Sequence, residues 1–172
     1  MNKLYLSFFL LLTSASMLAQ DTTTTPVPDK SNRLILHFKD TTGKFTQLAH
    51  IFIDRGYDID MKDREFGILR TKPSPLHGGD SFTDQLEIKT IFRDSTITFS
   101  GVTYSEWWGR DGTTYKVTSE VHYLKKNNRN IMLSWEELGK IAELLKPVFI
   151  TYSTVDVTKK GLKAELEYKR NN

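Results

Sequence analysis

Apolar and polar residues alternate repeatedly through the middle of this 172-residue chain, and this pattern constrains the fold more than any other feature. Tyr57, Ile59 and Met61 alternate with charged residues, which is the two-residue period of a β-strand. Similar runs follow at residues 86–99 and 115–123, and they are separated by short turns such as Arg93–Ser95. Strands joined by short turns predict a mainly antiparallel sheet.

Two other segments have the spacing of an amphipathic helix. The first begins after Asp40–Thr42, and its apolar side consists of Phe45, Leu48, Ala49 and Phe52. The second begins at the capping box Ser134–Glu137 and ends before Pro147. With strands at 34–38 and 66–71, the predicted order is β-α-β-β-β-β-β-α, and residues 148–152 suggest a short extended segment at the end. This order predicts an α+β domain, a curved antiparallel sheet with two helices on one face.

The first nineteen residues have the features of a secretory signal peptide. Lys3 precedes an apolar run at Leu4–Leu12, and a small residue, Ala19, ends the segment. The run is too short to span a membrane. We expect cleavage after Ala19, with Ser16 as the alternative, and export to the periplasm or the outside of the cell. The mature form is expected to have no transmembrane span.

The predicted mature chain divides into three parts. Residues 20–32 are rich in Thr and Pro and predict a disordered linker, residues 33–157 form one α+β domain, and residues 158–172 form a basic flexible tail. The tail contains five basic residues and two acidic ones, so its net charge of +3 equals the formal net charge of the whole chain. The domain itself is close to neutral, which argues against nucleic-acid binding. The tail could make weak contact with an anionic surface.

Several kinds of chemistry lack the residues that they require. The chain has no cysteine, which excludes disulfides, iron–sulfur clusters and thiol catalysis. Its four histidines are not spaced as metal ligands on a helix. The aspartates at 54–63 fit the solvated side of a strand, neutralised by Arg55, Lys62 and Arg64, better than a calcium loop. We therefore predict no metal, no cofactor and no catalytic residue.

Aromatic and charged residues gather between positions 104 and 112, and they are the predicted contact residues for a ligand or partner. These residues are Tyr104, Glu106, Trp107, Trp108 and Arg110. Adjacent tryptophans in a strand point to opposite faces, so only one of the two fits easily into a core. The other is expected to be exposed, as in a site for a sugar or a protein partner. The alternative is a hairpin tip whose tryptophans pack on the domain's own loops.

The segment Lys44–Thr71 resembles part of a known fold. It runs through a helix, Gly56, a strand, a turn at Asp63 and a return strand that starts near Gly67. This pattern is similar to the helix-then-hairpin core of secreted bacterial domains with a TBP-like (TATA-binding-protein-like) or helix-grip fold, such as the envelope lipoprotein domain of the BamC type. The resemblance implies a binding or assembly module. The chain departs from it by lacking a lipidation cysteine and by a longer segment at Trp107–Tyr123.

Together these features predict a non-enzymatic binding or interaction module of the bacterial cell envelope, with an envelope protein or a glycan as its partner. Two alternatives remain open. One is a carbohydrate-active enzyme or sugar-binding domain that uses Glu106 and a groove near Trp107 and Trp108. The other is a carrier that holds a small apolar ligand between helix and sheet.

Overall fold

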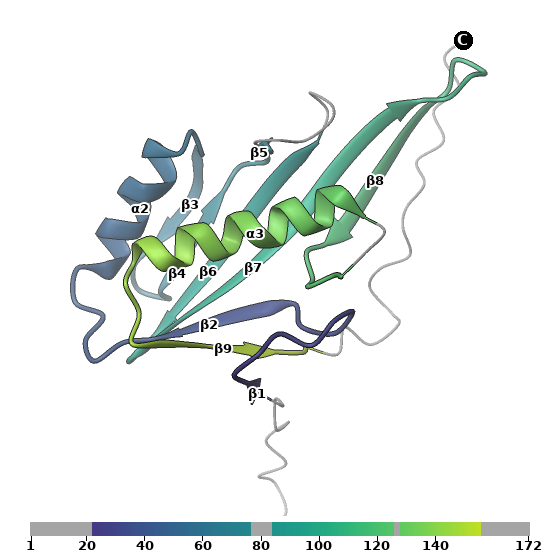
Figure 1. Cartoon of the computed structure of the whole chain (residues 1–172). Coiled ribbons are helices and arrows are strands. Elements are labelled where there is room, and N and C mark those ends of the chain that lie inside the picture. Colours follow the sequence, from purple (N-terminus) through teal and green to yellow (C-terminus); the bar gives the residue numbers. More distant parts are fainter. Residues whose placement is uncertain (1–21, 77–83, 126–127, 156–172) are drawn as a thin grey trace, which may run out of the picture.

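The computed structural model describes residues 22–76, 84–125 and 128–155, and these residues form one open antiparallel sheet with two helices (Figure 1). The strand order is β1-β9-β2-β7-β6-β4-β3, with β5 paired to β6 and β8 paired to β7. The bounds are β1 (Thr22–Thr23), β2 (Arg33–His37), β3 (Ile59–Asp63), β4 (Ile68–Thr71), β5 (Ser74–Pro75), β6 (Gln85–Arg93), β7 (Thr96–Trp108), β8 (Thr114–Glu120) and β9 (Phe149–Ser153). The predicted α+β class and the order of the main elements are confirmed.

Helices α2 (Lys44–Asp54) and α3 (Arg129–Leu144) pack on one face of this sheet and close a single core. The apolar sides predicted from helical spacing supply the helix half of the core: Leu48, Ala49 and Phe52 from α2, and Trp135, Leu138, Ile141 and Ala142 from α3. Alternate residues of β2, β4, β6 and β7 supply the sheet half. We call the helix-covered side of the sheet the inner face and the opposite side the outer face.

Helix α3 begins earlier than the capping box predicts. Its N-cap is Asn128, whose side-chain oxygen accepts a hydrogen bond of 3.1 Å from the backbone N–H of Ile131. Ile131 is buried and extends the apolar stripe back by one turn from Trp135. Ser134 therefore lies inside the helix, and Glu137 reaches Arg55 instead of capping the helix end.

The chain joins the fold before Arg33, the expected start of the domain. Within the predicted linker 20–32, Thr22–Thr23 forms strand β1 beside β9. Ser31 and Asn32 are buried, and the Ser31 carbonyl accepts a hydrogen bond of 2.8 Å from the Tyr123 N–H. β-branched threonines fit an edge strand well, so composition alone is a poor guide to this segment. The predicted signal peptide and the whole of the predicted tail lie outside the described residues.

The β3–β4 turn depends on a close backbone approach at Gly67. Its φ is +64°, and a Cβ atom there would lie 2.6 Å from the Phe92 carbonyl oxygen. The Phe92 N–H donates to the Gly67 carbonyl at 2.7 Å, which ties the turn to β6. The turn therefore requires a residue without a side chain at position 67. Neither described helix is long and apolar enough to cross a membrane.

Candidate functional site

The predicted contact residues lie on a hairpin that extends beyond the rest of the sheet (Figure 1). β6 pairs with β7 only as far as Tyr104, which lies opposite Gln85, while β2 pairs with the first part of β7. From Ser105 to Trp108, β7 pairs with β8 alone among the described strands. We call this projecting part of the hairpin, residues 105–117, the arm.

Tyr104, Glu106 and Trp108 occupy alternate positions of β7 that belong to the outer face. Ile97 and Phe99, at the odd positions, are fully buried beneath the helices, so the even positions point away from the core. The outer-face partners on β8 follow from the register: Thr118 lies opposite Tyr104, Lys116 opposite Glu106, and Thr114 opposite Trp108. The structure thus brings three of the five predicted residues to one face.

The other two predicted residues are separated from this set. The backbone of Trp107 pairs with Tyr115, between the Glu106 and Trp108 positions, and its side chain lies outside the described part of the structure. Arg110 is exposed in the turn at the end of the arm. The prediction that the two tryptophans face opposite sides is therefore left as a prediction.

The end of the arm carries an exposed aromatic ring beside an ion pair. The Trp108 side chain is 70% exposed, and Lys116 Nζ lies 3.2 Å from Glu106 Oε2 on the neighbouring pair of positions. Both charged side chains remain open to solvent.

Three hydrogen bonds hold the turn that presents this ring. The Gly109 N–H donates to the Thr113 carbonyl at 2.7 Å, and the Gly112 N–H donates to the Gly109 carbonyl at 3.1 Å. The Thr113 N–H donates to Asp111 Oδ1 at 3.0 Å, which lowers the pKa of Asp111. The turn is thus held by its own backbone and by the Asp111 side chain.

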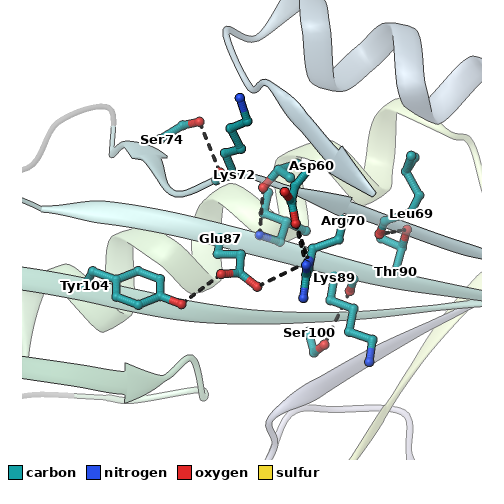
Figure 2. Close-up of polar contacts among 12 residues, drawn as sticks. Asp60, Leu69, Arg70, Lys72, Ser74, Glu87, Lys89, Thr90, Ser100 and Tyr104 are labelled. Atoms are coloured by element: carbon teal, nitrogen blue, oxygen red, sulfur yellow. Dashed lines mark hydrogen bonds and ion pairs between the residues drawn. The ribbon is translucent and has the colours of Figure 1, made fainter. Parts of the chain in front are cut away.

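A row of polar contacts crosses the outer face from β7 to β3 (Figure 2). The Tyr104 hydroxyl donates to Glu87 Oε2 at 2.8 Å, and Glu87 Oε1 lies 4.0 Å from Arg70 Nε. Arg70 Nε also donates to Asp60 Oδ2 at 2.9 Å, and its Nη2 bonds the same oxygen. Partial burial, together with the bond to Glu87, raises the pKa of Tyr104 to about 12.

The expected neutralisation of the aspartates by Arg55, Lys62 and Arg64 is wrong for Asp60. Asp60 is solvated as predicted, but its counter-charge is Arg70 on β4 rather than a neighbour in sequence. Arg55 pairs with Glu137 on α3, and Arg64 bonds the Thr46 hydroxyl on α2. Across the described residues, no group of three or more His, Asp or Glu side chains is placed to hold a metal ion.

A second row on the outer face is mostly apolar. Ile35, Thr98, Ile91 and Ile68 lie in register across β2, β7, β6 and β4. The three isoleucines have apolar side chains. They are half-buried by their neighbours, although both described helices lie on the inner face. The outer face therefore combines apolar and charged strips with the aromatic arm at one end.

Comparison with protein-family models, with curated proteins and with solved structures gave no match to this chain. The similarity of Lys44–Thr71 to TBP-like domains stays a prediction. Tyr104, Glu106 and Trp108, with Lys116 beside them, form the candidate site. Asp60, Arg70 and Glu87 extend it, and they were missed because only the strand register brings them next to Tyr104.

Proposed function

We propose that this chain is an exported, non-enzymatic binding domain of the bacterial cell envelope that contacts a protein partner through the arm. The observation that carries the proposal is the exposed Trp108 ring at the end of an ordered hairpin. Tryptophan, tyrosine and arginine dominate the energy of protein interfaces. Trp108, Arg110 and Tyr104 place all three residue types on or beside the arm.

The shape of the arm favours a protein over a small sugar as the partner. Sites for small ligands are concave and enclose most of the ligand, whereas Trp108 is the last residue of β7, in the β7–β8 hairpin that projects from the sheet (Figure 1). A projecting aromatic side chain suits insertion into a pocket of a larger partner. The neighbouring Glu106–Lys116 pair supplies a polar rim around that contact.

The proposed location and fold family rest on sequence features. The signal-peptide pattern of residues 1–19 supports export to the periplasm or beyond. The helix-then-hairpin pattern of Lys44–Thr71 supports a TBP-like binding module, and the antiparallel sheet with two helices on one face is compatible with it. The basic residues after position 158 support weak additional contact with an anionic surface.

Site-specific photo-crosslinking in the producing cells tests the protein contact. A photoreactive phenylalanine analogue replaces Trp108 in one variant and Phe66 in a matched control. Phe66 is 69% exposed, close to the 70% of Trp108, but it lies in the turn after the edge strand β3. We expect a discrete protein adduct of one mass from position 108 and none from position 66, because only the arm is proposed to bind.

Two results would count against this function. Equal adducts at both positions would show that any exposed aromatic residue is labelled. Absence of a protein adduct at 108, combined with retention of the purified chain on a glycan array that Trp108→Ala abolishes, would replace the protein partner by a sugar.

A further inference from the structure

The arm has an open backbone edge along β8. β8 pairs with β7 on one side, and no other described strand pairs with it. Exposed edges are usually protected by short length, bulges or charged side chains. β1 is only two residues long, and β3 has an irregularity between Ile59 and Met61. The stretch Thr114–Thr118 of β8 has no proline and no irregularity in its pairing with β7.

The hydrogen bonds at the two ends of the hairpin show which backbone groups face this edge. The Val121 N–H donates to the Gly101 carbonyl at 2.9 Å, and the Gly109 N–H donates to the Thr113 carbonyl at 2.7 Å. The register between these two bonds is continuous, and successive residues of a strand turn their N–H and C=O groups to opposite sides. Odd-numbered residues of β8 therefore bond β7. The even-numbered residues that turn these groups to the open edge are Thr114, Lys116 and Thr118.

The charged side chains of β8 are drawn away from this edge. Lys116 Nζ lies 3.2 Å from Glu106 Oε2, so the ammonium group is held toward β7. Glu120 pairs with Arg33 at the start of β2, and its Oε2 accepts from Asn32 Nδ2 at 3.3 Å. A lysine protects an edge because an added strand would bury its charge. Here the charge of Lys116 lies outside the space that such a strand would occupy.

The open edge lies beside the ring that is proposed to contact a protein. Thr114 is opposite Trp108 in the register, so a strand added to β8 would run two strand spacings, about 10 Å, from the Trp108 backbone. A partner that buries the exposed Trp108 ring is therefore already next to the outward N–H and C=O groups of β8. Extended segments bind such edges through main-chain hydrogen bonds.

We propose that the protein partner of the arm adds an extended segment to the open edge of β8, next to Trp108. This inference rests on the proposed function and names the form of the partner. Hydrogen bonds to the backbone of Thr114, Lys116 and Thr118 supply the binding. The segment has no proline at its pairing positions. It has a β-branched or aromatic residue opposite Val117, whose half-buried side chain belongs to the inner face.

Proline at an outward-facing position tests the pairing. Thr118→Pro removes an N–H that points to the open edge, and edge strands tolerate proline at such positions. Thr118→Ala is the matched control, since it loses the same hydroxyl but keeps the N–H. A photoreactive phenylalanine analogue that replaces Lys116 in the producing cells reports contact at the edge. We expect the adduct at 116 to contain the same partner mass as the adduct at 108, to fall about tenfold with Thr118→Pro and to change less than about twofold with Thr118→Ala.

Thermal unfolding of the purified variants checks that the fold is retained. Thr118→Pro is expected to have a Tm within about 3 °C of Thr118→Ala. Thr114→Pro repeats the test at a second outward position. Ser119→Pro removes an N–H that bonds β7 and should lower the Tm further than either of these prolines. Equal Tm values for prolines at 118 and 119 would contradict the assigned direction of the backbone groups and overturn the proposal.

The crosslinking outcomes separate the edge from the ring. Equal adduct yields at 116 for Thr118→Pro and Thr118→Ala would overturn the edge pairing, whereas an adduct at 108 would still support the contact of Trp108. An adduct at 116 that proline abolishes, without an adduct at 108, would support the edge and count against the ring. An adduct of twice the mass of the chain would assign the edge to a second copy, and no adduct at 116 would overturn the proposal.

Discussion

Glu137→Gln removes the charge from the buried ion pair that joins α2 and α3. The Glu137 side chain is only 6% exposed, and its two oxygens each accept a hydrogen bond of 2.7 Å, one from Arg55 Nε and one from Nη2. The Tyr57 hydroxyl lies 3.4 Å from the same carboxylate. Burial, together with the charge of Glu137, raises the pKa of Tyr57. The substitution keeps the side-chain shape but leaves one acceptor for two Arg55 donors, so it removes the charge and one of the two hydrogen bonds.

The expected cost follows from the environment of each partner. Breaking a fully buried pair costs about 3 to 5 kcal/mol, because the remaining charge stays desolvated. Here Arg55 is 29% exposed and can regain water, so the cost approaches that of hydrogen bonds to a charged group. We expect the free energy of unfolding to fall by about 2 to 3 kcal/mol, equivalent to about 5 to 10 °C in Tm for a domain of this size.

Urea unfolding followed by circular dichroism measures this change. Glu136→Gln is the matched control, because Glu136 is the preceding residue of the same helix and is exposed. The control is expected to change the free energy of unfolding by less than about 0.5 kcal/mol. Coinciding unfolding curves for the two variants would show that the pair with Arg55 contributes nothing to stability, and would refute this reasoning.

Two further substitutions test a backbone contact and a hydroxyl on the outer face. Gly67→Ala should lower the free energy of unfolding by about 3 kcal/mol, because a left-handed φ adds to the clash with the Phe92 carbonyl. The control is Gly112→Ala, where φ is +78° but the space around the residue is open. It should lower the free energy of unfolding by only about 1 kcal/mol in the same urea assay. The pKa of Tyr104 is raised to about 12 in the folded chain. The Tyr104 hydroxyl therefore keeps its proton at a pH at which the same group in the unfolded chain has lost it. Stability from this group is complete below about pH 10 and is lost as the pH rises toward 12. Tyr104→Phe should therefore reduce the fall in Tm between pH 10 and 12, and an unchanged fall would contradict the assigned shift.

Local periodicity was enough to predict the fold class because each main element bears its own pattern. Leu48 and Phe52 mark the buried side of α2, and the alternation of β6 and β7 marks the buried side of the sheet. The predicted start of α3 at Ser134 was wrong, because the sequence pattern of a capping box also occurs inside helices. Asn128 precedes an apolar stripe that begins at Ile131, and the buried Ile131 outweighs the local motif at Ser134.

The candidate site could be predicted only in part, since alternation indicates the face of a side chain but not its neighbour on the next strand. Tyr104, Glu106 and Trp108 share a face because they are two residues apart on one strand. Arg70 and Glu87 join Tyr104 through the register of three strands, and nothing in the local sequence fixes that register. The same limit explains why Asp60 was matched to nearby cations rather than to Arg70.

The exposure of Trp108 follows from a mismatch in strand length. β7 has thirteen residues and β6 has nine, and their pairing starts together at Thr96 opposite Arg93. β7 therefore passes the end of β6 at Tyr104, and its last residues have a described strand on one side only. A hairpin of two strands is marginal without additional packing. The hydrogen-bonded turn at Gly109–Thr113 stiffens the arm. A stiffened arm loses less conformational entropy when its tryptophan is buried by a partner, which is the condition under which a single exposed aromatic residue binds well.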